Sequence, residues 1–101
     1  MQITNEIDGK VGKIVLCDKF DFKTRNTFRQ ATEALIANTE VQTIDVDFTH
    51  VSYLDSSALG MLLLLKEKAE EQEKEVNLIH CQEAVRNILD IACFEQIFTI
   101  R

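Results

Sequence analysis

Strand-like and helix-like segments alternate along this chain, and this alternation restricts the possible folds more than any other feature. Within residues 42–48, apolar side chains occupy every second position, which is the period of a half-buried strand. Within residues 24–37 they recur at intervals of three and four, which is the period of a helix. Strands that alternate with helices are joined by crossovers, and crossovers favour a largely parallel sheet.

The same criteria divide the rest of the chain. Strands are expected at residues 2–7, 11–17, 42–48, 74–80 and 96–100, and helices at 24–37, from Asp55 or Ser56 to about Gln72, and at 82–92. The order β-β-α-β-α-β-α-β predicts an α/β fold, with a mostly parallel sheet of about five strands and three main helices packed on it. With 101 residues, we expect one domain over residues 1–101.

Two shorter signals refine this outline. The Asp8-Gly9 pair predicts a turn between the first two strands, and therefore an N-terminal hairpin. Thr24 is expected to cap the first helix, and residues 18–23 are expected to form a polar loop.

Charge and cysteine content exclude several classes of protein. Eleven basic residues face 17 acidic ones, giving a net charge of −6, which argues against nonspecific binding to nucleic acid or to anionic membranes. Three cysteines without a CxxC pair argue against a disulfide framework. The N-terminus lacks the pattern of a signal peptide, and no apolar run approaches the roughly 20 residues of a membrane span. We therefore expect a cytoplasmic location and no direct membrane insertion.

The most informative local segment is LDSSALG at residues 54–60, which is followed directly by the apolar run MLLLL. It places two hydroxyls and a carboxylate at the start of the second helix. One interpretation is a simple helix cap, since Asp and Ser oxygens accept hydrogen bonds from free backbone N–H groups. The other is a switch, because a phosphate on a serine there would meet the positive end of the helix.

A helical projection of this segment gives it two different sides. The predicted sheet-facing stripe consists of Ala58, Leu62, Leu65 and Ala69, with Leu59 and Met61 at its flanks. The predicted partner-binding residues are on or beside the other half: Ser56, Ser57, Gly60, Leu63, Leu64 and Glu67. The glycine would let another backbone approach, and contiguous apolar residues indicate a protein-binding surface. Alternatively, the two leucines pack under a neighbouring loop or helix.

The sequence does not support an enzyme, and it indicates no cofactor or metal site. His50 and His80 are the only histidines, and no Gly-x-Ser-x-Gly elbow or glycine-rich phosphate loop is present. Cys81 adjoins His80, but adjacent strand residues point to opposite faces. Asp45 and Asp47 lack a third ligand and are interpreted as part of a solvated sheet face. Two further cysteines are expected to be small core residues, Cys17 and Cys93.

Residues 44–60 resemble the signature of the STAS family, named for sulfate transporters and anti-sigma factor antagonists. That signature is a hydrophobic strand, a short loop ending in Asp-Ser-Ser/Thr-Gly, then Leu-Gly and an apolar helix. Residues 85–89 and 98–100 resemble the closing helix and strand of the family, so the resemblance covers the whole chain. Ala58 stands where the family commonly has glycine.

The resemblance implies a regulator that changes partners. It makes Ser56 the phosphoacceptor, with Ser57 as the alternative, and places Asp55 and Asp21 near the phosphorylation site. An unphosphorylated antagonist of this family binds an anti-sigma factor that is also a serine kinase, and phosphorylation by that kinase separates the two. A PP2C-type serine phosphatase restores the antagonist. The chain would thus be the substrate of an enzyme.

Two other functions are compatible with the same resemblance. One is a STAS subunit without a phosphate cycle, docked through its second helix in a lipid-transport ABC complex. The other is a STAS regulator of a different output, such as biofilm formation. The intact Asp55-Ser56-Ser57 sequence favours a phosphorylated regulator over the constitutive subunit, because such subunits often lack a clean acceptor.

Overall fold

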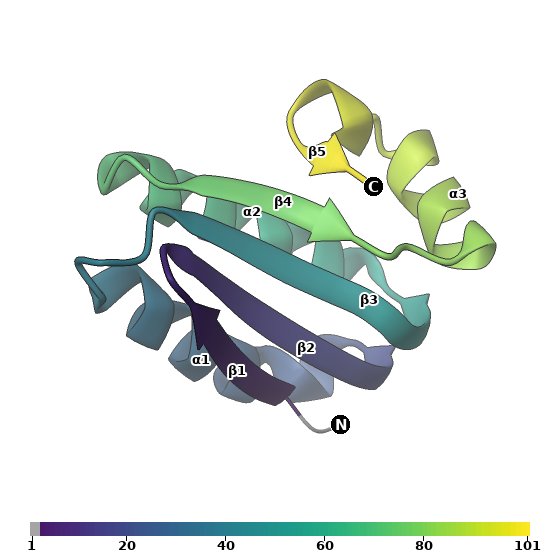
Figure 1. The fold of residues 1–101 in the computed structure, drawn as a ribbon. Helices are drawn as coiled ribbons and strands as arrows, with labels where there is room; N and C mark the ends of the chain where they lie inside the picture. The colour runs from purple at the N-terminus through teal and green to yellow at the C-terminus, as the bar shows by residue number, and fades with distance from the viewer. Residues whose placement is uncertain (1–2) are drawn as a thin grey trace.

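The computed structural model describes residues 3–101, which form one five-stranded sheet with three α-helices (Figure 1). The strands are β1 (Ile3–Asp8), β2 (Val11–Phe20), β3 (Thr43–Leu54), β4 (Glu75–Ile79) and β5 (Thr99–Ile100), adjacent in that order. The α-helices are α1 (Arg25–Ala37), α2 (Ser56–Glu71) and α3 (Glu83–Ile91), and the 3-10 helices are η1 (Phe22–Thr24) and η2 (Phe94–Gln96).

The predicted fold class and element order are confirmed. β1 pairs antiparallel with β2, so the N-terminal hairpin is present, and the remaining neighbours pair in parallel. Gln2, the first residue of the predicted first strand, lies outside the described residues. The last strand is shorter than predicted: Gln96 belongs to η2, and β5 begins only at Thr99.

The strands β2 and β3 are much longer than their apolar alternation predicts. Residues 18–20, expected in a loop, belong to β2, and β3 continues from Phe48 to Leu54. The pairing register shifts twice here: from Val15 to Cys17 the strand β2 advances by two residues, while β3 advances by three, from Asp47 to His50. An extra residue of this kind interrupts the period of two and increases the local twist. The sequence pattern is therefore lost where the strand still continues.

The main core lies between one face of the sheet and the helices α1 and α2 (Figure 1). Phe28 and Leu35 of α1 and Leu62 of α2 are among the buried side chains of this core, as are Ile14 and Val46 of the sheet. The helix α3 follows β4 at the carboxyl end of the strands and contacts β3. The long β3 thus delivers residues 54–56 to the same end of the sheet.

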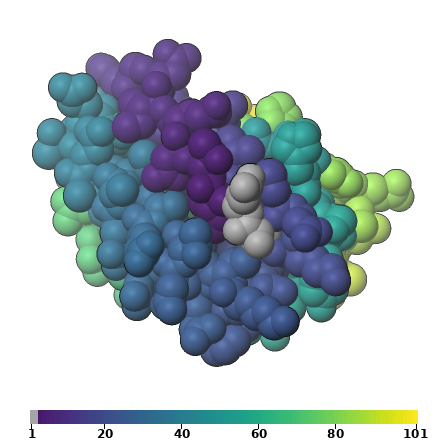
Figure 2. Space-filling view, turned by 90° about the horizontal axis from the view of Figure 1, so that it is seen from below, coloured from purple at the N-terminus to yellow at the C-terminus, as the bar shows by residue number. Residues whose placement is uncertain are grey.

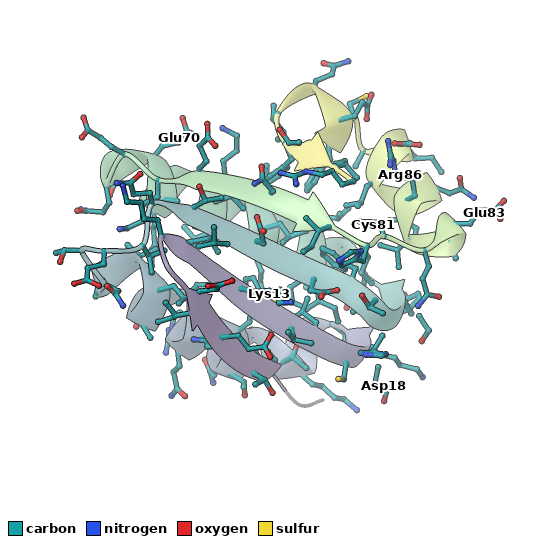
Figure 3. All side chains as sticks on the ribbon, in the orientation of Figure 1. Lys13, Asp18, Glu70, Cys81, Glu83 and Arg86 are labelled. Atoms are coloured by element: carbon teal, nitrogen blue, oxygen red, sulfur yellow. The ribbon has the colours of Figure 1, made fainter. Side chains whose placement is uncertain are left out.

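The other sheet face is polar but less solvated than the sequence predicts. Only 6% of Asp47 is exposed, and its Oδ1 accepts hydrogen bonds from the backbone N–H and the hydroxyl of Thr49, at 2.8 and 2.6 Å. Lys13 Nζ lies 4.0 Å from Asp47 Oδ2, and Lys13 is labelled on this face in Figure 3. Asp45 Oδ1 accepts a hydrogen bond from Asn77 Nδ2 at 3.0 Å. These bonds offset the cost of removing the carboxylates from water.

The prediction that Thr24 caps α1 is wrong. Thr24 occupies the N-cap position, but its hydroxyl donates to the carbonyl oxygen of Asp21 at 2.7 Å and does not cap the helix. Asp21 takes the capping role one turn earlier, where its Oδ1 accepts from Lys23 N at 3.0 Å and caps η1. On the side of the molecule seen in Figure 2, β1 and α1 lie next to each other, joined by a hydrogen bond from Asn5 Nδ2 to Ala31 O.

Candidate functional site at the start of the second helix

Asp55 is the residue that caps α2. Its backbone is extended (φ −105°, ψ −178°), and its Oδ1 accepts a hydrogen bond from Ala58 N at 2.9 Å. Its Oδ2 accepts from Phe22 N at 3.3 Å, and its own N–H donates to Phe20 O at the same distance. One carboxylate therefore fixes the first turn of α2 and also joins it to the loop after β2.

Because Asp55 makes the cap, the first helical residue, Ser56, is not needed for it. Ser56 is exposed and Ser57 is half-buried. Their backbone N–H groups belong to the first turn of a helix, where no carbonyl four residues earlier is available. A phosphate on Ser56 would add about −1.5 to −2 charge at the positive end of the helix, where negative charge is favourable. Helix capping alone thus accounts for Asp55 but leaves the serine unexplained.

Asp21 is connected to this site through its neighbour in the sequence. Asp21 is half-buried and caps η1, and the next residue, Phe22, donates its N–H to Asp55. The loop that carries Asp21 is therefore held against the residue that precedes Ser56.

The sheet-facing stripe predicted for α2 is present: Ala58, Leu62, Leu65 and Ala69 are all between 0 and 2% exposed. Leu59 and Met61 are partly buried beside it, as predicted for flanking positions.

The opposite side of α2 is open to solvent. We call this surface the outer face of α2; it consists of Ser56, Gly60, Leu63, Leu64 and Glu67, all of which are exposed. The exposed fractions of Leu63 and Leu64 are 43% and 46%, so the alternative that a loop or helix covers them is wrong within residues 3–101. Within residues 3–101, a Cβ built on Gly60 would have no heavy atom within 4 Å, apart from its chain neighbours and the backbone of its own helix. Packing inside this chain therefore does not require a glycine there.

Two exposed aromatic residues near this end of α2 were not singled out by sequence reasoning. Phe22 is 54% and Tyr53 47% exposed. The guanidinium of Arg25 lies 3.9 Å from the centre of the Phe22 ring, and its Nη1 donates to Phe22 O at 2.9 Å. Phe22 could have been identified from the sequence, because it is an aromatic side chain in a segment predicted to be a polar loop.

Within the part of the chain that the structure describes, the remaining chemical candidates do not form a second site. Burial raises the pKa of the Cys81 thiol to about 11, so the thiol stays protonated at neutral pH (Cys81 is labelled in Figure 3). His80 follows β4 with a left-handed backbone (φ 57°), and so is not the strand residue that we expected. Cys17 is only half-buried and Cys93 is exposed, so the prediction that both are core residues is wrong.

Residues 3–101 contain no group of three or more His, Cys, Asp or Glu side chains arranged to hold a metal ion. Within the same residues, every helix is too short or too polar to span a membrane.

Comparison with known proteins places the chain among STAS domains. A family model described as "Mlab, STAS domain" matches residues 3–99. A STAS-domain containing protein of Pseudomonas aeruginosa (strain UCBPP-PA14) is 43% identical over 93 residues, which is 92% of this chain and 90% of that protein.

Solved structures share the fold at low sequence identity. The anti-sigma factor antagonist SpoIIAA in its unphosphorylated form superposes with a TM-score of 0.77 at 20% identity, covering 99% of this chain and 87% of that one. An anti-sigma factor antagonist from Mycobacterium paratuberculosis superposes with a TM-score of 0.86 at 19% identity, covering 98% and 83%. The superpositions show the shared fold, and the family model and the Pseudomonas relative show that the chain belongs to the STAS domain family.

Proposed function

We propose that this chain is a cytoplasmic regulator of the anti-sigma factor antagonist type, which changes partners when Ser56 is phosphorylated. The observation that supports this most directly is the division of roles at the start of α2. Asp55 supplies the cap, so the exposed hydroxyl of Ser56 is free on a face that also carries Gly60 and Leu63.

In the unphosphorylated state, the outer face of α2 binds the partner, an anti-sigma factor that is also a serine kinase. Leu63 and Leu64 supply apolar contact area. Gly60 lets the partner's backbone come close to the helix, because no side chain stands between them. Ser56 lies at the N-terminal end of this contact.

Phosphorylation of Ser56 ends the contact without unfolding the chain. The helix N-terminus favours the phosphate, so the free protein tolerates it. In the complex, however, a doubly charged group would be removed from water with no opposite charge to pair with. This would cost roughly several kcal/mol, which corresponds to orders of magnitude in affinity. A PP2C-type phosphatase then returns the chain to its binding form.

The first experiment identifies the modified residue. The chain is incubated with its cognate serine kinase and ATP, and the phosphopeptide is mapped by mass spectrometry. We expect phosphate on Ser56, little change in a Ser57→Ala variant and loss of phosphate in Ser56→Ala. Phosphate on any residue outside 56–57 would refute the assignment.

The second experiment tests the mechanism of release. Ser56→Asp and Ser56→Ala are compared for affinity to the kinase and for far-ultraviolet circular dichroism. We expect Ser56→Asp to bind at least about 100-fold more weakly than Ser56→Ala, because it brings an unpaired charge into the contact. The two spectra should be the same. An unfolded Ser56→Asp variant would contradict release at the interface.

A constitutive STAS subunit is the second candidate, because the family that matches residues 3–99 is the Mlab, STAS domain family. Such a subunit, docked for example in a lipid-transport ABC complex, would use the outer face of α2 without phosphate. Leu63→Ala would then weaken binding to the complex, while Ser56 would not be phosphorylated in cells. Stoichiometric phosphate on Ser56 in protein purified from its native cells would exclude this candidate.

A further inference from the structure

A groove between α1 and α2 combines apolar and basic side chains. It encloses about 240 Å³, and its lining includes Arg25, Phe28, Arg29, Met61, Leu64 and Lys68. Phe28 and Leu65 are buried at its base, and Met61 is partly buried beside them. Leu64, which is 46% exposed, belongs both to the groove and to the outer face of α2.

The groove is basic, although the chain is acidic. Among residues 3–101, its lining includes three basic side chains and no acidic one, whereas the whole chain has 11 basic and 17 acidic residues. Glu33 lies nearby, with Oε1 at 3.9 Å from both Arg29 Nε and Lys68 Nζ. One carboxylate thus serves two cations at the limit of contact distance, and exposed ion pairs of this kind are weak. The groove therefore presents positive charge that an incoming anionic group could match.

The length of the groove corresponds to two turns of helix. Its lining runs from Arg25 to Thr32 on α1 and from Met61 to Lys68 on α2, seven residue steps on each helix. At a rise of about 1.5 Å per residue, each wall is about 10 Å long. Apolar residues at positions i, i+3 or i+4, and i+7 of an amphipathic helix span the same distance, as in other helix-in-groove complexes.

We propose that this groove is a docking site for an acidic amphipathic helix of a protein partner. The apolar side chains of the partner helix contact Phe28, Met61 and Leu64. The carboxylates of that helix pair with Arg25, Arg29 and Lys68. Binding in this groove does not require phosphorylation of Ser56. It extends the contact surface from the outer face of α2 onto α1.

A designed peptide pair tests the proposal with the intact chain. The probe is a fluorescein-labelled helical peptide of about 14 residues, with leucines at i, i+3 and i+7 and glutamates on both flanks. Its control has lysines in place of the glutamates. In fluorescence anisotropy titrations we expect binding of the acidic peptide only, with an affinity that falls as salt is added. Amide resonances of α1 and α2 along the groove should shift in nuclear magnetic resonance spectra.

Four variants identify the groove as the binding site. Arg29→Gln combined with Lys68→Gln removes two rim charges, and Leu64→Ala removes an apolar contact; each change should weaken binding about 10-fold. Leu63→Ala is the matched control, because Leu63 lies on the outer face of α2 but does not line the groove. This variant should bind the peptide as tightly as wild type. Glu33→Gln removes the competing carboxylate and should tighten binding about 2- to 5-fold. A gain in affinity cannot result from partial unfolding.

Several results would overturn the proposal. These are equal binding of the acidic and lysine peptides, no resonance shift along the groove at millimolar peptide, or equal affinities of wild type and the Arg29/Lys68 double variant. Displacement of the peptide by sodium dodecanoate at stoichiometric concentration would assign the groove to a fatty acyl ligand instead. Ser56→Asp should bind the peptide within about twofold of wild type, because Ser56 is eight residues, about 12 Å, from Leu64. Failure of the phosphorylation switch would thus leave this result unchanged.

Discussion

Two glycines in regular secondary structure have opposite surroundings. Gly12 of β2 is buried, and a Cβ there would lie 2.8 Å from Leu35 Cδ2 and 3.3 Å from Val41 Cγ1. Gly60 of α2 is exposed, and a Cβ there would meet no other part of the described chain within 4 Å. The fold explains the first glycine, because α1 and the segment after it pack closely over β2. It does not explain the second, which directs attention to a partner.

The two sides of α2 show the same contrast between a buried and an exposed position. The largest effect on the free energy of unfolding is expected here. Leu62→Ala should lower the free energy of unfolding by about 2–5 kcal/mol, because Leu62 is fully buried and its removal leaves a cavity. Leu63→Ala, one residue along, should change it by no more than about 0.5 kcal/mol. Urea denaturation followed by circular dichroism measures both. Similar losses would mean that the outer face of α2 also packs within the chain.

Gly12→Ala should have the next largest effect. The added methyl group meets the buried side chain of Leu35, and overpacking of this kind costs about 1–3 kcal/mol. Thermal unfolding measures the loss. The double variant Gly12→Ala/Leu35→Val, which removes the atoms that collide, should recover part of the cost, whereas no recovery would place the strain elsewhere.

The assignment of the cap to Asp55 predicts a smaller difference. Asp55→Ala loses the hydrogen bonds from Ala58 N and Phe22 N and should cost about 1–2 kcal/mol. Asp55→Asn keeps a capping oxygen and should lose less. Ser56→Ala should stay within about 0.5 kcal/mol of wild type. If Ser56→Ala were the more costly of the two alanine variants, the serine would have a structural role and the phosphoacceptor proposal would be weakened.

Gly60→Ala, at the exposed glycine, should have a smaller effect on stability than Asp55→Ala. Alanine is a better helix former, so the variant should be more stable by about 0.5–1 kcal/mol. Binding to the partner should nevertheless weaken, because the methyl group blocks close approach at the outer face of α2. Denaturation and affinity measured on the same sample would show the opposite signs. A destabilised variant would mean that Gly60 serves the fold.

Sequence reasoning reproduced the fold wherever the apolar period was regular. The order of strands and helices, the bounds of α2 within a residue or two, and its stripe of Ala58, Leu62, Leu65 and Ala69 all follow from local spacing. It failed in the second half of β3, because the two register shifts break the period of two on which strand recognition rests. It also failed for Asp47, which is buried, and for Cys93, which is exposed, because burial depends on residues distant in the sequence and on backbone conformation.

For the candidate site, the sequence determined the segment, and the tertiary structure decided how its residues divide the work. The spacing of LDSSALG before an apolar run was enough to locate a helix start with two hydroxyls and a carboxylate. Which residue caps that helix depends on φ and ψ at Asp55 and on the approach of Phe22 from the loop after β2. Whether Leu63 and Leu64 are covered, and which cations lie beside Leu64, depends on how α1 packs against α2. Local periodicity places side chains around one helix, but only packing determines what each of them meets.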